Sequence, residues 1–288
     1  MNKASFSCIV FGEILYDCFP DRTCLGGAAL NFAWNLRQLG FPVSMVSAVG
    51  RDELGQEARA FLTRAEIGQQ WVADRNEPTG TVDVFLQDGQ PSYTIVSGVA
   101  WDHIETVVET ARPPALVYYG TAAQRSPANR PGLQHLLATN PRHRIFDVNL
   151  RKDAYAAETV RFGLAAATIV KLNDEEWEEV RVIAGIDDPA EFLARFELDL
   201  LAITLGEKGA DLYTPNALFE SRLESVPVVD AVGAGDAFSA VLAAGALCGT
   251  DPQELLHLAC RAGAAAVQHP GAHLELPEAV RAHFHRAI

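Results

Sequence analysis

The stretch DAVGAGDAFSA, residues 230–240, determines how the rest of the chain is interpreted. Gly233–Gly235 forms a flexible turn, and the residues from Ala237 to Leu247 are small or apolar, with good helical propensity. The stretch therefore predicts a loop that opens a buried helix. The first backbone N–H groups of a helix lack partners within it, and the helix macrodipole adds partial positive charge there, so the turn is suited to hold an anion.

Asp236 directly follows this turn and lies in the same electrostatic field. One interpretation is a phosphate-binding turn beside an ionised carboxylate that accepts a proton from an attacking hydroxyl. The other is an ordinary glycine turn in which Asp236 caps the helix, and this is the more frequent meaning of so short a motif. The choice between them depends on the remaining sequence.

Strands and helices alternate along most of the chain. An apolar run, Phe6–Phe11, ends at Gly12 as in a strand buried on both faces, and residues 28–40 are apolar nearly all round. Because parallel strands need crossovers, the alternation predicts an α/β fold with a doubly wound, mainly parallel sheet. Further strands are expected at 43–49, 115–119, 144–148, 168–172 and 200–204, helices at 52–65, 127–138, 158–167, 173–184, 236–247, 252–267 and 277–287, and antiparallel edge strands at 208–214 and 217–223.

One segment breaks this alternation. Residues 79–96 contain two β-rich runs around Asp88-Gly89, which is a hairpin signal. We expect the hairpin to pair with the ribbon 14–20 in a small sheet outside the main body. The chain is thus expected to be one domain, residues 1–288, with a lid formed by segments 13–21 and 79–98.

Composition limits the classes of function. The net charge of −14 argues against a general nucleic-acid surface, which needs clustered Lys and Arg. The N-terminal sequence lacks the architecture of a secretory signal, and the longest run of small apolar residues, 237–249, is too short to span a bilayer. Five cysteines without a CxxC pair are expected to be reduced thiols. These features predict a cytoplasmic protein that binds neither nucleic acid nor membrane.

Unusual polar residues follow several predicted strands, where ligands bind in sheets of this kind. Gly26 and Gly27 precede a buried helix that contains Asn31, and an Asn in so apolar a helix needs a hydrogen-bond partner. These three residues suit close backbone approach to a polyhydroxylated ligand, or else form a turn with a helix-packing Asn. Asn149 and Arg151, in FDVNLR, end another strand and are either ligand contacts or solvated loop residues.

Two further strand ends carry candidate nucleotide and metal contacts. Asn173 and Glu176 begin an acidic helix after Lys171, where they either orient a hydrated Mg²⁺ or serve as an N-cap and a first-turn glutamate. Thr204–Gly209, with the sequence TLGEKG, is a glycine loop suited to backbone contact with phosphates or a nucleotide, or is a plain tight turn.

Taken in order, these motifs resemble those of the PfkB or ribokinase-like family of carbohydrate kinases, and the resemblance covers nearly the whole chain. GEILYD, GGAALN, KLNDEE, TLGEKGA and DAVGAGDAF are similar to the family's successive elements. The resemblance implies ATP-dependent phosphorylation of a small sugar, with Mg²⁺ and with a monovalent cation left open. One departure is Ala231-Val232, where the family usually has Thr or a similar residue after the first Asp of the motif.

The resemblance also implies a role for each candidate residue. Asp236 is the expected catalytic base, and the amides of the preceding turn, with that of Asp236, form the anion hole. The turn residues are Gly233, Ala234 and Gly235, the expected sugar contacts are Asp17, Gly26, Gly27, Asn31, Asn149 and Arg151, the ATP contacts are Lys171, Asn173, Thr204, Gly206 and Gly209, and the magnesium contacts are Asn173 and Glu176.

The substrate is less sharply defined than the reaction. GGAALNFAWNLRQLG with FDVNLR most resembles the fructokinase and 2-keto-3-deoxygluconate kinase branches, which favours fructose or a related keto-sugar over ribose or a nucleoside. A dinucleotide-dependent oxidoreductase fits poorly because Phe238 stands where the third glycine would be. A non-catalytic sugar-binding protein remains an alternative. The exposed edge of the lid leaves a homodimer through the lid open.

Overall fold

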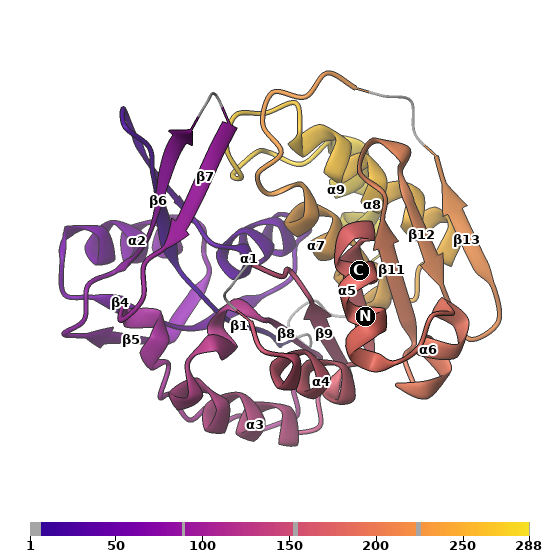
Figure 1. Ribbon diagram of the computed structural model, residues 1–288, viewed down its shortest axis with the longest axis horizontal. Coiled ribbons are helices and arrows are strands. Elements are labelled where there is room, and N and C mark those ends of the chain that lie inside the picture. The colour runs from indigo at the N-terminus through magenta and orange to yellow at the C-terminus, as the bar shows by residue number, and fades with distance from the viewer. Residues whose placement is uncertain (1–6, 88–89, 152–154, 223–225, 288) are drawn as a thin grey trace.

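The structure is a computed structural model that describes residues 7–87, 90–151, 155–222 and 226–287. Within them, helices flank a central sheet, and a smaller sheet lies to one side of it (Figure 1). The strands are β1 (Cys8–Phe11), β2 (Leu15–Cys18), β3 (Thr23–Gly26), β4 (Val43–Gly50), β5 (Gly68–Arg75), β6 (Gly80–Gln87), β7 (Gln90–Ile95), β8 (Leu116–Gly120), β9 (His143–Asp147), β10 (Ile169–Asn173), β11 (Leu200–Thr204), β12 (Ala210–Tyr213) and β13 (Leu218–Ser221). The α-helices are α1 (Ala28–Gln38), α2 (Glu53–Arg64), α3 (Arg130–Ala138), α4 (Ala157–Ala166), α5 (Asp174–Ala184), α6 (Pro189–Arg195), α7 (Ala234–Cys248), α8 (Pro252–Ala266) and α9 (Glu278–Ala287), with short 3₁₀ turns between some of them.

The central sheet has the strand order β13-β12-β11-β10-β9-β8-β1-β4-β5. From β10 to β5 each neighbouring pair is parallel, and β10 is also parallel to β11, whereas β12 and β13 form an antiparallel edge. β1 is buried along its whole length, as its continuous apolar run predicts. This is the mainly parallel, doubly wound sheet expected from the alternation of strands and helices, and it brings the carboxyl ends of the parallel strands to one edge.

Helices cover both faces of the central sheet. α1, α2, α7, α8 and α9 contribute to the hydrophobic core on one face, and α3, α4, α5 and α6 to the core on the other. α7 is buried on nearly all sides because it packs between its neighbours α1 and α8. Its position fixes the start of the helix, and with it Asp236, against the first turn of α1.

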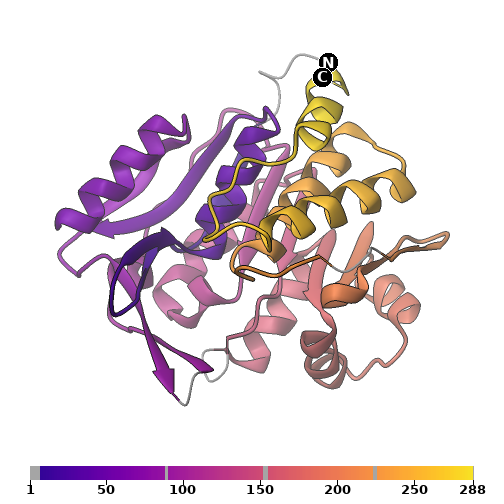
Figure 2. The ribbon, with the colours of Figure 1, turned by 90° about the horizontal axis from the view of Figure 1, so that it is seen from above.

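The smaller sheet has the order β3-β2-β6-β7, and it extends from one end of the main body (Figures 1 and 2). β2 pairs with β6 in parallel, so the ribbon and the hairpin meet as expected, while the turn at 88–89 lies outside the described residues. Just before β6, Asp52 joins the small sheet to the main body. Its carboxylate accepts hydrogen bonds from the Thr79 amide (2.7 Å) and hydroxyl (2.6 Å). Just after β7, Arg125 donates to the Val96 carbonyl at 2.7 Å and pairs with the largely buried Asp102, which joins this end of the sheet to the main body.

Several element boundaries differ from those expected. β5 and β3 are not anticipated as strands, because residues 68–75 mix polar and apolar side chains and residues 23–26 are short and glycine-terminated. α7 begins at Ala234, two residues before the expected start, so the helix includes part of the glycine turn. Phe6 and Leu223, at the ends of expected strands, lie outside the described residues. Among the described residues, no helix has the length and apolarity needed to cross a membrane.

Candidate active site

Asp236 meets α1 at the edge of the sheet where the parallel strands end. The Asn31 side-chain amide donates a buried hydrogen bond to Asp236 Oδ2 at 2.8 Å. The oxygen of the same amide, Asn31 Oδ1, is buried and accepts no hydrogen bond from the described residues. A Cβ at Gly26 would lie 3.3 Å from Asp17 Oδ2 and 4.0 Å from Asn31 Oδ1, so these acceptors converge on a backbone that carries no side chain. The arrangement offers acceptors to hydroxyl groups.

The position of α1 depends on Gly27 and Glu13. Gly27 is the N-cap of α1 with a φ of 104°, and a Cβ there would lie 2.8 Å from the Glu13 carbonyl oxygen. A glycine is therefore required on both conformational and steric grounds. Glu13 is buried, which raises the pKa of its carboxyl, while backbone N–H groups of Ala28 and Ala29 oppose the rise. The Glu13 carboxyl thus lies beside the first backbone N–H groups of α1.

The first turn of α7 presents unpaired backbone donors. Gly233 caps the helix in the left-handed conformation (φ 80°) and has no side chain to accept from the turn. The Ala234 N–H makes only a long contact (3.4 Å) with the Ala231 carbonyl, and the N–H groups of Gly235 and Asp236 donate to no described residue. These donors, together with the positive end of the helix, form a site suited to phosphate oxygens.

The carboxyl of Asp236 is set to titrate near neutrality. Burial and then the charge of Asp147 raise its pKa to about 7, against the opposing effects of the Asn31 hydrogen bond and of the Lys171 and Arg151 charges. Burial disfavours the ionised form because the low-dielectric interior solvates it poorly. A general base works best with a pKa close to the operating pH, so this carboxylate has the properties of a base.

Beneath the turn lies a buried ion pair. Lys171 Nζ donates to Asp147 Oδ1 at 3.2 Å, and the Ser239 hydroxyl donates to Asp147 Oδ2 at 2.8 Å. A Cβ at Gly235 would lie 2.8 Å from Lys171 Nζ, so the ammonium sits directly against the turn. Burial lowers the pKa of Lys171, but the carboxylates of Asp147, Glu176 and Asp236 outweigh burial and raise it. Lys171 therefore stays charged next to the turn.

Arg151 and Asn149 lie in the loop after β9. Arg151 is exposed and forms no ion pair with the described residues, yet its charge lowers the pKa values of Glu13, Asp17 and Asp236. It therefore lies near the cluster of acids and is free to meet an anionic group. Asn149 has a positive φ of 39°, and its carbonyl accepts from the Thr121 hydroxyl at 3.1 Å. Its side chain has no polar contact within the described residues.

Asn173 and Glu176 form a capping box at the start of α5. Asn173 Oδ1 accepts from the Glu176 N–H at 2.7 Å, and Glu176 Oε2 accepts from the Asn173 N–H at 2.8 Å. Glu176 Oε1 also accepts from the Leu150 amide at 2.8 Å, which ties the loop after β9 to α5. Burial raises the pKa of Glu176 and the Lys171 charge opposes this. In the described ranges no three His, Cys, Asp or Glu side chains gather as a metal cage.

The loop TLGEKG follows β11 and turns into β12. Thr204 closes the strand, and Gly206 has a positive φ of 58° with open space around its α-carbon. Gly209 (φ 100°) is required for a different reason, because a Cβ there would collide with the Ser221 carbonyl of β13. Gly206 thus leaves open space beside its backbone, whereas Gly209 serves the packing of the edge strands.

Three residues of this site are not identified as candidates by sequence reasoning. Asp147 belongs to FDVNLR, of which only Asn149 and Arg151 are candidates, although its complete burial makes it the centre of the pair with Lys171. Glu13 interrupts an apolar run, and a charged residue in such a run is a signal that could have marked it as a candidate. Tyr118 lies buried in β8, where nearby carboxylates add to the effect of burial in raising its pKa, and nothing in its sequence context marks it.

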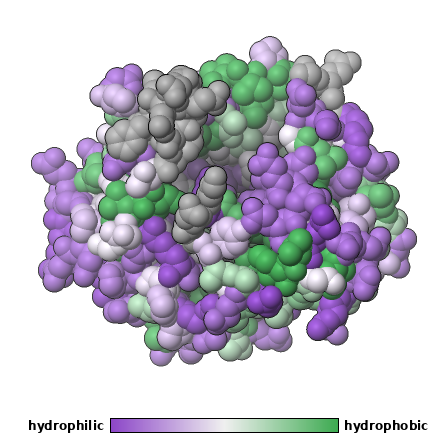
Figure 3. Space-filling view, in the orientation of Figure 1, coloured by the Kyte–Doolittle hydropathy of each residue, from purple (hydrophilic) through white to green (hydrophobic). Residues whose placement is uncertain are grey.

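The face shown in Figure 3 is largely hydrophilic and is hollowed near its centre, where α1 and α7 lie in Figure 1. The candidate site brings together residues from both halves of the chain. Asp17, Gly26, Gly27 and Asn31 come from the N-terminal half, and Asp236 and its turn come from the C-terminal half. These are the sugar-side and base residues expected from the sequence.

Comparisons with known proteins identify relatives of this chain. A fructokinase from Escherichia coli is 30% identical over 93% of this chain and 95% of its own. A fructokinase structure from Vibrio cholerae O395, with fructose, ADP and calcium ion bound, has a TM-score of 0.81 and 24% identity over 97% of this chain and 98% of that one. A nucleoside kinase from Burkholderia thailandensis in complex with inosine has a TM-score of 0.79 and 22% identity over 98% and 97% of the two chains. The model of the pfkB family carbohydrate kinases matches residues 10–279, so the chain belongs to this family and is a carbohydrate kinase.

Proposed function

We propose that this kinase transfers the γ-phosphoryl group of ATP to a primary hydroxyl of a small keto-sugar, with fructose as the preferred acceptor. The observation that carries the proposal is the convergence of Asp17 and Asn31 on the bare backbone of Gly26, next to Asp236. The unpartnered Asn31 Oδ1 needs a donor, and a sugar hydroxyl supplies one. Similarity to the E. coli fructokinase over nearly the full length of both chains supports fructose.

The proposed chemistry uses two features of the first turn of α7, the Asp236 carboxylate and the free backbone N–H groups. Asp236 accepts the proton of the sugar hydroxyl as that oxygen attacks the γ-phosphorus. The free N–H groups of Gly235 and Asp236, with the buried Lys171 ammonium beside them, stabilise the charge on the transferring group. Closure of the small sheet over the sugar would exclude water and so limit hydrolysis of ATP. Under this proposal residues 1–288 act as one domain with segments 13–21 and 79–98 as its lid.

ATP is proposed to lie over the loop of Thr204, Gly206 and Gly209, with Asn173 toward its phosphates. Mg²⁺ prefers oxygen ligands and keeps much of its water shell. Asn173 and Glu176 present oxygen atoms that the capping box already uses, so they fit contact with water molecules of the ion better than a direct ligand set. When bound, the ion would neutralise phosphate charge. Arg151 is proposed to contact an anionic group of the substrate or the nucleotide.

A substrate panel tests the acceptor. With ATP and Mg²⁺, we expect ADP release to depend on the sugar, and kcat/KM for fructose to exceed that for 2-keto-3-deoxygluconate, ribose and a nucleoside by at least about tenfold, since a lost hydrogen bond in a site built for hydroxyls is costly. A nucleoside as the best acceptor would replace fructose by the nucleoside-kinase alternative. No ADP release with any acceptor would favour a non-catalytic sugar-binding protein.

The pH dependence tests the base. Since the pKa of Asp236 is raised to about 7, the ionised fraction increases as pH rises through neutrality. We expect kcat/KM of the free enzyme to increase by about tenfold per unit below pH ~7 and to level off above it. Rates measured from pH ~5.5 to ~9 at saturating ATP check this. A kcat/KM that is flat over this range would contradict the assignment of Asp236 as the base.

Location and assembly are also proposals. We place the enzyme in the cytoplasm, where ATP and reduced thiols are available, and none of the cysteines in the described residues forms a disulfide. The edges of the small sheet offer unpaired backbone groups, and we propose that two copies pair through this sheet. Sedimentation at the monomer mass at every concentration would contradict the dimer.

A further inference from the structure

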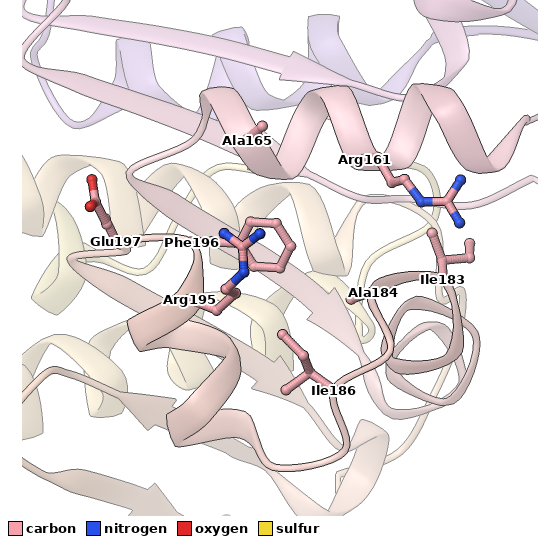
Figure 4. A pocket seen from close by; sticks show the side chains of 8 residues that line it. All are labelled: Arg161, Ala165, Ile183, Ala184, Ile186, Arg195, Phe196 and Glu197. Carbon is pink, nitrogen blue, oxygen red and sulfur yellow. The ribbon is translucent and has the colours of Figure 1, made fainter.

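A cavity lies away from the candidate active site. It has a volume of about 540 Å³ and is formed by the outer side of α4 and the ends of α5 and α6 (Figure 4). α5 begins at the capping box of Asn173 and Glu176 and ends at this cavity, so about 16 Å of helix separates the two places. The lining residues are Arg161, Ala165, Ile183, Ala184, Ile186, Arg195, Phe196 and Glu197.

The floor of this cavity is apolar. Ile183, Ile186 and Phe196 are half-buried and pack against the core of this face, and the alanines from α4 and α5 are too small to fill the space between them. Pockets that hold small molecules have volumes of roughly 300–1,000 Å³ and mostly apolar walls with a few polar groups. The volume of this cavity falls within that range, and its apolar floor is combined with charged groups at the rim.

The polar groups at its rim are dominated by two arginines. Arg161 projects from α4 and Arg195 from α6 (Figure 4), and neither forms a hydrogen bond or an ion pair with any described residue. Each has an acidic residue on its own helix at a spacing that permits pairing, Glu158 and Glu191 respectively. Arg195 instead lies with its guanidinium 5.9 Å from the Phe196 ring, over the floor of the cavity.

The local charge is opposite to that of the whole protein. The chain carries a net charge of −14, yet the cavity is lined by two arginines and one acid, Glu197. An unpaired guanidinium beside apolar surface favours a carboxylate or a related anion, because the charge-assisted hydrogen bond is strengthened where water is partly excluded. A polyhydroxylated sugar would find few partners on such a floor.

We propose that this cavity binds a small amphipathic anion, with an apolar body against Ile183, Ile186 and Phe196 and a carboxylate, sulfonate or phosphate group at Arg161 and Arg195. The proposal does not depend on the kinase reaction or on its substrate. It assigns a ligand site to the surface at the C-terminal end of α5, whereas the capping box of Asn173 and Glu176 is at the other end of this helix.

The test uses 8-anilinonaphthalene-1-sulfonate, an aromatic sulfonate that fluoresces when bound in apolar surroundings. We expect saturable binding to the full-length chain, displaced by octanoate and by octyl phosphate but not by octan-1-ol at equal concentration. The variant Arg161→Gln/Arg195→Gln should weaken binding of the probe by at least about tenfold. Ala165→Trp, which fills the cavity without a change of charge, should weaken it to a similar extent.

The matched control is Arg64→Gln/Arg261→Gln, which makes the same change in net charge. It removes two other exposed arginines, on α2 and α8, that form no hydrogen bond or ion pair with the described residues. The control should bind the probe like the wild type, and all variants should unfold at the wild-type temperature. The proposal is overturned if wild-type binding does not saturate, if octan-1-ol displaces the probe as well as octanoate does, or if either cavity variant binds like the control.

Discussion

Asp236→Asn is expected to lower kcat by about 10²–10⁴-fold while the protein still folds and binds ATP and sugar, because only proton transfer is removed. The asparagine keeps the size of the side chain, and its oxygen can still accept from the Asn31 amide. The free N–H groups of the turn are backbone groups and remain in place. The loss should therefore appear in kcat, measured by ADP release at saturating substrates, with dissociation constants measured by calorimetry nearly unchanged.

Stability gives an independent check on the same variant. The pKa of Asp236 is raised from 3.8 to about 7 on folding, so the folded protein binds this proton more tightly than the unfolded chain does. The free energy of unfolding therefore falls as pH rises through this window, and the loss is complete above pH ~7. Asp236→Asn should be at least as stable as the wild type at pH ~8, and Asp21→Asn, at an exposed position, serves as the control. Near-normal turnover of Asp236→Asn would remove Asp236 from the role of base.

The fold is predictable because its signals are local. The apolar run that becomes β1 is short and ends at a glycine, and the apolar stretch that becomes α1 is long enough for a helix and is flanked by glycines, so length and boundary residues distinguish the strand from the helix. β3 and β5 escape prediction because such strands are defined by their partners. β3 pairs with β2 and β5 with β4, and neither pairing can be deduced from residues 23–26 or 68–75 alone.

The candidate site is predictable residue by residue but not as a network. Motif spacing points to Asp17, Asn31 and Asp236, and the structure brings them together at one edge of the sheet. The pairing of Lys171 with Asp147 joins residues 24 positions apart on adjacent parallel strands, and only the register of β9 and β10 places them face to face. The sequence context of Lys171 suggests a nucleotide contact, whereas its burial places it under the turn.

Lys171→Met is expected to lower the free energy of unfolding by about 3–5 kcal/mol, which is the usual cost of removing one partner of a buried ion pair. Asp147 is completely buried, and without the ammonium it keeps only the Ser239 hydroxyl as a described hydrogen-bond donor. Methionine has nearly the length of lysine, so lost packing adds little. Denaturant unfolding at pH ~7.5, with equal slopes for both proteins, measures the difference.

The same substitution should also raise the pKa of Asp236. The charge of Lys171 lowers the pKa of Asp236, and that of Asp147 raises it. In Lys171→Met the rise of kcat/KM with pH should therefore move to higher pH, and in the double variant Lys171→Met/Asp147→Asn it should move back, because both charges are gone. The double variant should also recover most of the lost stability, since the amide oxygen of the introduced asparagine can still accept from the Ser239 hydroxyl. Two results would contradict support of the turn by the Lys171–Asp147 ion pair. One is a free energy of unfolding for Lys171→Met within about 1 kcal/mol of the wild-type value, and the other is a double variant no more stable than the single one. A purely structural lysine would change stability without moving the pH profile, so the two measurements together separate support of the turn from tuning of its carboxylate.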